Sequence, residues 1–366
     1  MAIATNDPAL LKSKYLKSKS SFFKKGVATA FISGILYGFY SAFIVAGEGV
    51  GNWVGWWGLE PLAGMLGFCL LCAVGAGLND TCSAVWQIII LVVKGKFSDF
   101  AATLKTRPGL IMVGVALAGG PIAATAYNVG LMMAGGIVAA ISALCAAIGA
   151  LIGRMFLKQK LNLRMVCGII ICFAAAVVIG GTSFDSLDKS AFIGCCIAFI
   201  AALGWGIEGS IGGYATSMID DDISITIRQC TSGLTNLIIV VPILCVLAVR
   251  MIDVSFTGGA NLYTYLIVGA CAGGAIIWFA FSGLFCGQSF RMWYKGNSMC
   301  GAALGMTLNA MYSFWVPLCS WILMGLILPW DYAPLTATQW IMAVVEVFGI
   351  WLIAMNPLDL LKKKEA

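Results

Sequence analysis

The chain has 366 residues, of which 61% are hydrophobic and 10% are charged, and its mean hydropathy is +0.96. Soluble domains are about half apolar and about a quarter charged, so this composition excludes an ordinary soluble protein and indicates a polytopic membrane protein. The net charge is +6 and the chain contains no His, which excludes His-dependent catalytic triads and imidazole proton relays.

Ten apolar stretches follow one another along the chain. A helix needs about 20 largely apolar residues to cross the hydrocarbon core, and its backbone groups must bond within the helix. The sequence therefore predicts an all-α polytopic membrane protein with ten transmembrane helices, between basic tails at 1–25 and 357–366. The predicted spans are 26–47, 62–93, 109–128, 133–156, 165–182, 190–210, 224–249, 262–288, 299–328 and 337–355.

Positive charge is distributed unevenly between the two sides of this arrangement. Of the 22 Lys and Arg residues, all except Lys189 and Arg250 fall on one side, and this count includes Arg228 near the start of span 7. Short cytoplasmic loops carry such an excess because positive charge resists translocation. We therefore expect an integral protein of the bacterial cytoplasmic membrane with both termini in the cytoplasm. Membrane lipid is the expected partner of the basic tails, and no nucleic-acid partner is expected.

The 14 Cys residues fall almost entirely inside the predicted spans, which indicates free thiols rather than a disulfide framework. Cys69 and Cys72 have CxxC spacing, but no second pair follows at a zinc-site spacing and no His is present. A zinc or redox site would need such further ligands. The sequence therefore predicts neither a metal nor a cofactor.

The two halves of the chain repeat each other weakly but in order. The stretch 36–40 in span 1 matches 204–208 in span 6 at an offset of 168. Five spans per half is an odd number, so the second copy would enter the membrane in the opposite orientation. The sequence thus predicts two inverted five-helix repeats, at 26–183 and 190–356. Further matches, at offsets of 167 and then 174, are Tyr127 with Tyr294, Ser142 with Asn309, Gly168 with Met342 and Ala175 with Gly349.

One part of this pattern resembles a known family. The stretches 125–131, 139–142 and 156–162, followed by Gly168 at the start of an apolar span, resemble the EamA-like branch of the drug/metabolite transporter superfamily. The resemblance covers almost the whole chain. It implies a secondary transporter with alternating access around a midplane cavity formed by spans 1, 3, 4, 6, 8 and 9. It also implies a small-molecule solute as partner, and it leaves a homodimer open.

Ionisable groups at membrane depth are costly and are therefore functional candidates. Glu208, among the small residues of span 6, could contact a solute or carry a coupling proton, and the alternative is a wet, inert position at the cytoplasmic mouth. Glu346 in span 10 is a second proton-coupling candidate, with a structural hydrogen bond as its alternative.

Asp80 is the third proton-coupling candidate because of the length of span 2. Its 32 residues would extend about 48 Å against a core of about 30 Å, so the helix must tilt, project or break. A break at Asn79–Asp80 would place a carboxylate at membrane depth, as broken helices do elsewhere. The alternative is an early exit from the bilayer.

Aromatic and amide side chains complete the predicted solute site. An aromatic wall with one carboxylate suits a cationic amine or a sugar, although each ring could equally be core packing. With Glu208, the candidate solute-binding residues are Tyr37, Tyr40, Tyr127, Asn128, Trp205, Trp278, Asn309 and Tyr312.

The sequence favours a secondary-active transporter of a small polar organic metabolite, sugar-like or amine-like and amino-acid-like, with proton coupling as an option. Arg291 and Lys295, predicted at the cytoplasmic start of span 9, leave open an exchanger of an anionic or phosphorylated metabolite. A channel-type pore is the other alternative. An enzyme is not expected, because no GxxxxGK[ST] motif occurs and the loops are too short for a nucleotide-binding fold.

Overall fold

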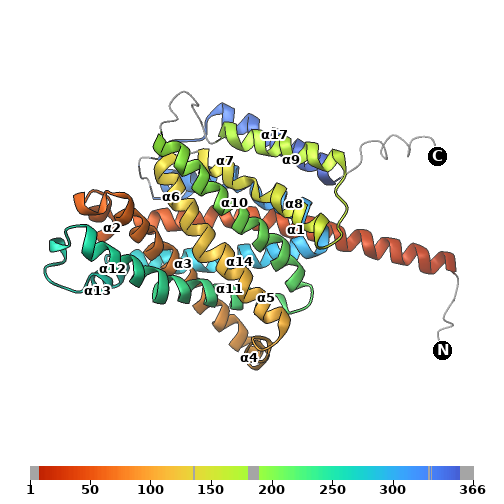
Figure 1. Ribbon diagram of the computed structural model, residues 1–366. Helices are drawn as coiled ribbons and strands as arrows, with labels where there is room; N and C mark the ends of the chain where they lie inside the picture. The colour runs from red at the N-terminus through yellow and green to blue at the C-terminus, as the bar shows by residue number, and fades with distance from the viewer. Residues whose placement is uncertain (1–7, 135–136, 180–188, 329, 331, 355–366) are drawn as a thin grey trace.

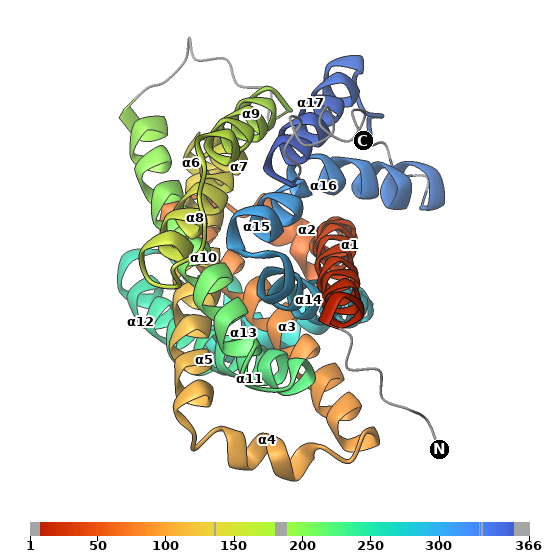
Figure 2. The ribbon, with the colours of Figure 1, turned by 90° about the vertical axis from the view of Figure 1, so that its right-hand side faces the viewer.

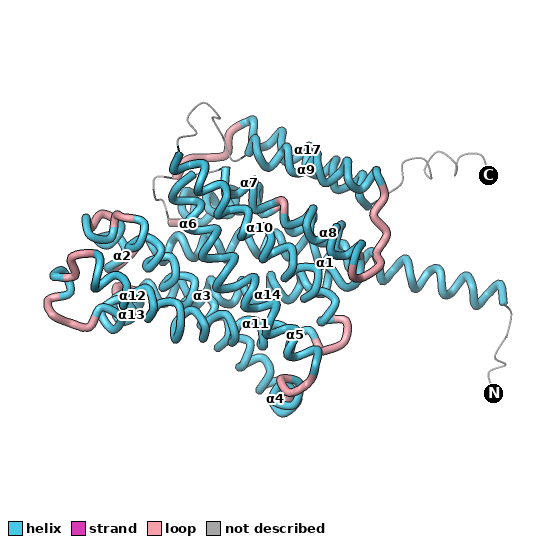
Figure 3. The backbone as a smooth tube through the Cα atoms, viewed as in Figure 1, coloured by secondary structure: helices cyan, strands magenta, loops and turns pink. Residues whose placement is uncertain are grey.

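The computed structural model describes residues 8–134, 137–179, 189–328, 330 and 332–354 (Figure 1). All regular secondary structure in these ranges is helical (Figure 3). The helices are α1 (Pro8–Glu48), α2 (Asn52–Trp57), α3 (Met65–Val93), α4 (Phe97–Thr103), α5 (Arg107–Leu117), α6 (Thr125–Ala134), α7 (Ile137–Ala143), α8 (Cys145–Met155), α9 (Leu163–Ile179), α10 (Lys189–Thr216), α11 (Asp221–Thr235), α12 (Val241–Met251), α13 (Leu262–Cys271), α14 (Ala275–Cys300), α15 (Ala302–Ala310), α16 (Tyr312–Ser320) and α17 (Ala337–Ala354).

Several of these helices join end to end. The π-helical segments η2 (Ala118–Ala124) and η4 (Asn236–Val240) connect α5 to α6 and α11 to α12, and η6 (Trp321–Ile327) extends α16. Pro121 lies inside η2, where it removes a backbone donor. Two short 3-10 turns, η1 (Glu60–Leu62) and η5 (Ser255–Thr257), lie in the loops.

The structure is that of a polytopic helical membrane protein. Among the described residues, seven helices are long and apolar enough to cross a membrane, or up to eight if the bent pair α13–α14 forms one span. Two shorter apolar helices cover Ile141–Met155 and Leu163–Ile179. Large apolar side chains such as Val344 and Phe348 on α17 are exposed on the outside of the bundle, as expected for a surface that faces lipid rather than water.

Helix α1 runs through the bundle and beyond it. Its N-terminal part projects past the other helices (Figure 1), and Lys17 and Lys19 on α1 are exposed. The rest of α1 packs along α14 and α16 at very short range. A Cβ atom on Gly38 would lie 2.6 Å from the Trp315 carbonyl oxygen, and one on Gly26 would lie 2.6 Å from Met299 Cβ. Glycine is therefore what allows these backbones to approach.

Four packing relationships bring the first half of the chain against the second. α1 packs along α14, and α10 packs along α5, η2 and α6. α3 lies against α11, and α9 lies against α17 at the edge of the bundle (Figure 2). Each half thus contributes one helix, α1 or α10, that packs mainly against helices of the other half.

The break in a long helix lies elsewhere than Asn79–Asp80. Helix α3 is continuous from Met65 to Val93, so the suggestion that span 2 breaks there is wrong. The sharp bend, of 79°, lies instead between α13 and α14. Gly273 and Gly274 have φ angles of +62° and +83°, which side-chain-bearing residues rarely adopt. Gly273 also packs on Gly51, where a Cβ would lie 2.5 Å from the Cα of Gly51.

Two predicted helix boundaries are wrong for the same reason. Helix α14 does not end near residue 288 but continues to Cys300, where Gly301 with φ of +89° ends it. Helix α11 begins at Asp221, three residues earlier than predicted. In both places polar and charged residues resemble a loop in sequence, yet they lie on helix faces that neighbouring helices cover.

Candidate functional site

A cavity of about 450 Å³ lies in the middle of the bundle. Its walls come from both halves of the chain, namely from α1, α2, α3, η2, α6 and α9 and from α10, α11, α14, α16 and α17. Seven residues that the sequence singled out lie in this lining. They are Tyr37, Tyr40, Asp80, Tyr127, Asn128, Trp205 and Tyr312.

Aromatic rings form most of one wall. Tyr37 on α1 stacks on Tyr312 on α16, with ring centroids 4.5 Å apart, and touches Tyr40 one turn further along α1 at 4.6 Å. On α6 and α10, the rings of Tyr127 and Trp205 are 5.2 Å apart. Such rings offer flat apolar faces together with hydroxyl groups, which suits a solute that has both apolar and polar surfaces.

Arg228 on α11 supplies the positive charge of the cavity. Its side chain is only 3% exposed, and its guanidinium group lies over the Phe290 ring at 4.1 Å from the centroid. Nε donates to Glu208 Oε1 at 2.8 Å, and Nη1 donates to Asp80 Oδ2 at 3.0 Å and to Gln229 Oε1 at 2.9 Å. A buried guanidinium group needs such partners because an unpaired buried charge is strongly destabilising.

The sequence reasoning missed this role, because it counted Arg228 among the loop charges that set the topology. The structure places it inside the bundle instead. One signal could have identified it: Ser224, Arg228 and Ser232 follow each other at intervals of four residues, which puts them on one helix face. All three are buried, so the polar face of α11 is directed into the protein.

Glu208 on α10 lies behind Arg228. It is completely buried, and its Oε1 accepts hydrogen bonds from Arg228 Nε and from the Tyr294 hydroxyl, the latter at 2.6 Å. Oε2 has no hydrogen-bond partner among the described residues and sits against Gly119, where a Cβ would collide with it. The alternative of a wet position at the cytoplasmic mouth is therefore wrong. Glu208 is also absent from the cavity lining, but it is hydrogen-bonded to Arg228, which is part of that lining.

Asp80 lines the cavity from the middle of an unbroken α3. Its Oδ2 accepts from Arg228 Nη1 and from the Ser232 hydroxyl at 2.5 Å, while Oδ1 accepts from Asn79 Nδ2 at 3.1 Å. Asp80 is thus accommodated inside the bundle because it pairs with Arg228, and α3 does not break to accommodate it.

Like Glu208, three further predicted site residues do not line this cavity. Trp278 stacks on Phe43 with ring centroids 6.1 Å apart, and both rings pack against an apolar cluster formed by α1, α16 and η6. Asn309 is buried and donates to the Ser33 hydroxyl at 3.0 Å. Glu346 lies behind α16, where its Oε1 accepts a hydrogen bond from Ser313.

Glu48, at the last position of α1, is a lining residue that the sequence reasoning did not consider. It is half-buried, and none of the described Lys and Arg residues forms an ion pair with it. A Cβ atom on Gly75 would lie 2.5 Å from Glu48 Oε1, so a larger residue there would displace the carboxylate from this position. The cavity therefore contains one paired cation and one unpaired carboxylate.

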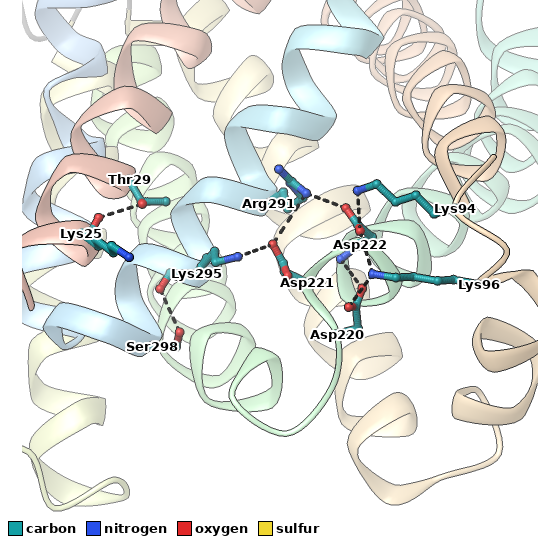
Figure 4. Close-up of polar contacts among 10 residues, drawn as sticks. All are labelled: Lys25, Thr29, Lys94, Lys96, Asp220, Asp221, Asp222, Arg291, Lys295 and Ser298. Carbon is teal, nitrogen blue, oxygen red and sulfur yellow. Dashed lines mark hydrogen bonds and ion pairs between the residues drawn. The ribbon is translucent and has the colours of Figure 1, made fainter. Parts of the chain in front are cut away.

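Ion pairs hold the helix ends together at some distance from the cavity (Figure 4). Three consecutive Asp residues at the start of α11 lie between the C-terminal end of α3 and the last turns of α14. Asp222 accepts from Lys94 at 2.7 Å, from Lys96 at 3.1 Å and from Arg291 at 2.5 Å. The hydrogen bonds that Lys96 donates to Asp220 and Asp222 raise the pKa of Lys96.

This ion-pair cluster, formed by Lys94, Lys96, Asp220, Asp221, Asp222, Arg291 and Lys295, changes one expectation. Arg291 and Lys295 do not begin span 9 but lie within α14, and Lys295 pairs with Asp221 at 2.9 Å. Neither residue lines the cavity. Lys94 is 14 residues beyond Asp80 on α3, or about 21 Å at about 1.5 Å per residue. Lys94 is therefore well separated from the cavity, and no residue of the ion-pair cluster lines it.

Comparison with known proteins bears on the fold alone. No family model matches the chain, and no curated protein matches it. A solved structure described as "Crystal structure of protein" matches with a TM-score of 0.57 and 13% sequence identity, over 90% of this chain and 96% of the other. The helical arrangement as a whole therefore also occurs in an experimentally determined structure.

Proposed function

We propose that the protein is a secondary-active transporter that binds a small polar organic solute in the central cavity and moves it by alternating access. The observation that carries this proposal is the cavity itself, with aromatic rings and a buried Arg228 between the two halves of the chain. Its volume of about 450 Å³ falls within the range of about 300–1,000 Å³ that is usual for small-molecule sites.

Ten spans in two inverted five-helix repeats form part of the proposal. The helical packing supports it, because α1 with α14 mirrors α10 with η2 and α6, while α3 with α11 and α9 with α17 pair equivalent helices. The helices divide at equivalent positions too, at Leu144 between α7 and α8 and at Met311 between α15 and α16, an offset of 167. Both termini are placed on the cytoplasmic side, as the charge distribution favours.

The solute class follows from the charges in the cavity. Arg228 is already neutralised by Asp80 and Glu208, whereas Glu48 has no cation beside it among the described residues. An amine or amino-acid-like solute could place its ammonium group at Glu48 and its apolar part on the aromatic wall. A sugar could use the same rings and the amide of Asn128.

The structure gives less support to an exchanger of an anionic solute or to a channel. An anionic solute would need free cations, yet Arg291 and Lys295 are paired with Asp residues. A channel would need a continuous pore, whereas the ion-pair cluster joins α3, α11 and α14 and none of its residues lines the cavity.

A counterflow experiment tests the proposal. The purified chain would first be screened for thermal stabilisation by sugars, amines and amino acids, because a ligand of the folded state raises the unfolding temperature. Proteoliposomes would then be assayed for counterflow of the stabilising solutes in labelled form. We expect Tyr127→Ala, in the cavity lining, to lose counterflow, and Tyr214→Ala, on an exposed position of α10, to keep it. Unsaturable ion current in planar bilayers without counterflow would reject the transporter in favour of a channel.

A further inference from the structure

A second and much smaller space lies behind the wall of the central cavity. Its volume is about 10 Å³, at the lower limit for a single water molecule, and Glu346 of α17 contributes to its lining. The space lies between the two helix divisions at Leu144 and Met311, since Ala143 and Ala310 also line it. Where a helix is interrupted, some backbone carbonyl groups lose their hydrogen bonds within the helix.

Glu346 is buried there without a cation. It is 2% exposed, its Oε1 lies 2.6 Å from the Ser313 hydroxyl, and its Oε2 has no hydrogen-bond partner among the described residues. Of the described side chains that face it, only Cys172 on α9 can titrate, and Cys172 Sγ donates to the backbone oxygen of Glu346 at 3.3 Å. α15 and α16 contribute Thr307 and Ser313, which carry no charge.

Among the described residues, the charged side chains on neighbouring helices are too far away to act as counter-ions. Arg164 on α9 lies eight residues from Cys172, and Arg154 on α8 lies eight residues from Ala146, about 12 Å in each case at about 1.5 Å per residue. A buried carboxylate without a counter-ion takes up a proton more readily than it stays charged. Glu346 differs in this respect from Asp80 and Glu208, which both pair with Arg228.

Ser313 connects this site to the central cavity. It lies in the lining of the cavity and also contacts Glu346. Its hydroxyl lies 3.2 Å from the Ala310 carbonyl oxygen, which is available because Phe314 N donates to Met311 O at 2.9 Å. The hydroxyl carries one proton and can donate it to only one of the two acceptors at a time.

Two hydrogen-bond arrangements follow. When Glu346 is neutral, its O–H group can donate to Ser313 Oγ while Ser313 donates to the Ala310 carbonyl. When Glu346 is ionised, Ser313 donates to the carboxylate instead. In passing from the first to the second, the O–H bond of Glu346 breaks, Ser313 Oγ accepts that proton, and the original hydroxyl proton of Ser313 passes to solvent in the cavity. No other reactant is needed.

We infer that Glu346 is a proton-binding site that exchanges its proton with the central cavity through Ser313, and that this proton drives solute transport. The second part rests on the proposed transport function. The first part does not, because proton exchange requires only the contacts of Glu346 and Ser313.

Infrared spectroscopy of the purified full-length protein tests proton binding without any solute. A carbonyl band of a protonated carboxylic acid is expected in the wild type, and it should disappear as pH is raised. Glu346→Gln should lack this band, whereas Glu60→Gln, at an exposed position, should keep it. A wild-type spectrum without the band, or a Glu346→Gln spectrum identical to it, would overturn the assignment.

Ser313→Ala provides a second variant in case Glu346→Gln does not fold. It keeps the carboxyl group but removes the hydroxyl that stabilises the ionised form, so the band should persist to a pH higher by about one unit. An unchanged titration would show that Ser313 does not take part.

The coupling role is measured in proteoliposomes with the panel of labelled sugars, amines and amino acids. We expect Glu346→Gln to keep counterflow and to lose uptake driven by a pH gradient. Equal pH-driven uptake in the variant and the wild type would overturn the coupling role. Absence of counterflow for the whole panel in the wild type would count against the transport function itself, while the infrared result would still decide the protonation of Glu346.

Discussion

Arg228 on α11 and Glu208 on α10 form an ion pair inside the bundle, with Arg228 Nε 2.8 Å from Glu208 Oε1. Neither side chain is more than 3% exposed. Asp80 of α3 completes the group through Arg228 Nη1. Three helices from the two halves of the chain therefore meet at a single guanidinium group beside the cavity.

Removing this cation should destabilise the protein strongly. Arg228→Ala leaves Asp80 and Glu208 as buried carboxylates without a cation, which typically costs about 3–5 kcal/mol. Thermal unfolding in detergent should show a lower midpoint than in the wild type. The triple variant Arg228→Ala, Asp80→Asn, Glu208→Gln should recover part of the loss. If Arg228→Ala were as stable as the wild type, Arg228 would not be needed to neutralise Asp80 and Glu208.

Glu208→Gln should separate function from folding. The glutamine retains an oxygen that can accept from Arg228 Nε and from Tyr294, so the protein should remain folded in detergent. Arg228 then has only Asp80 as an anionic partner, and we expect counterflow to fall at least tenfold because the guanidinium group is less firmly positioned. Wild-type counterflow in this variant would show that Glu208 has no part in transport.

Glu48→Gln distinguishes the two solute classes. The carboxylate is an unpaired lining group, so its neutralisation should weaken binding of an amine at least tenfold while leaving that of a sugar nearly unchanged. The measurement is the ligand concentration needed for thermal stabilisation. Glu60→Gln, at an exposed loop position, is the matched control and should alter neither. Equal affinities for an amine in Glu48→Gln and the wild type would remove Glu48 from the site.

The ion-pair cluster should determine how easily the adjoining helix ends open. Asp222→Asn weakens three charge-assisted hydrogen bonds at once, from Lys94, Lys96 and Arg291. Hydrogen exchange at the last turn of α3 and the first turn of α11 should become about tenfold faster, corresponding to about 1.4 kcal/mol of local stability. Asp253→Asn, at an exposed loop position, should leave both segments unchanged. Unaltered exchange in Asp222→Asn would show that the ion pairs do not hold these ends.

Gly274→Ala should strain the bend between α13 and α14. The residue has a φ of +83°, where a Cβ is unfavourable by about 1–2 kcal/mol even though the space around it is open. The unfolding midpoint should therefore fall. Gly55→Ala within α2, at a position with open space and a negative φ, is the control and should be neutral or slightly stabilising. Equal stability of Gly274→Ala and the wild type would indicate that the bend adapts.

The membrane character and the helical nature of the chain could be predicted from sequence because the requirement is local. A span must be apolar over about 20 consecutive residues, and such a run is visible without any knowledge of its neighbours. Seven predicted site residues lie together in the cavity, among them Tyr37, Tyr127 and Tyr312. Five of the seven are aromatic, and for these the aromatic ring within a span was the signal, although it applied equally to Trp278, which packs elsewhere.

Charged residues were harder to place, because their position depends on partners distant in the sequence. Arg228 looked like a loop charge, yet its burial is made possible by Asp80, 148 positions earlier, and by Glu208 on another helix. Arg291 looked like a free cation until the fold brought Asp222 to it. The sequence by itself determined that the chain is a helical membrane protein with several spans; only the tertiary structure decided which charges neutralise each other, because Coulomb attraction depends on distance in space and on burial.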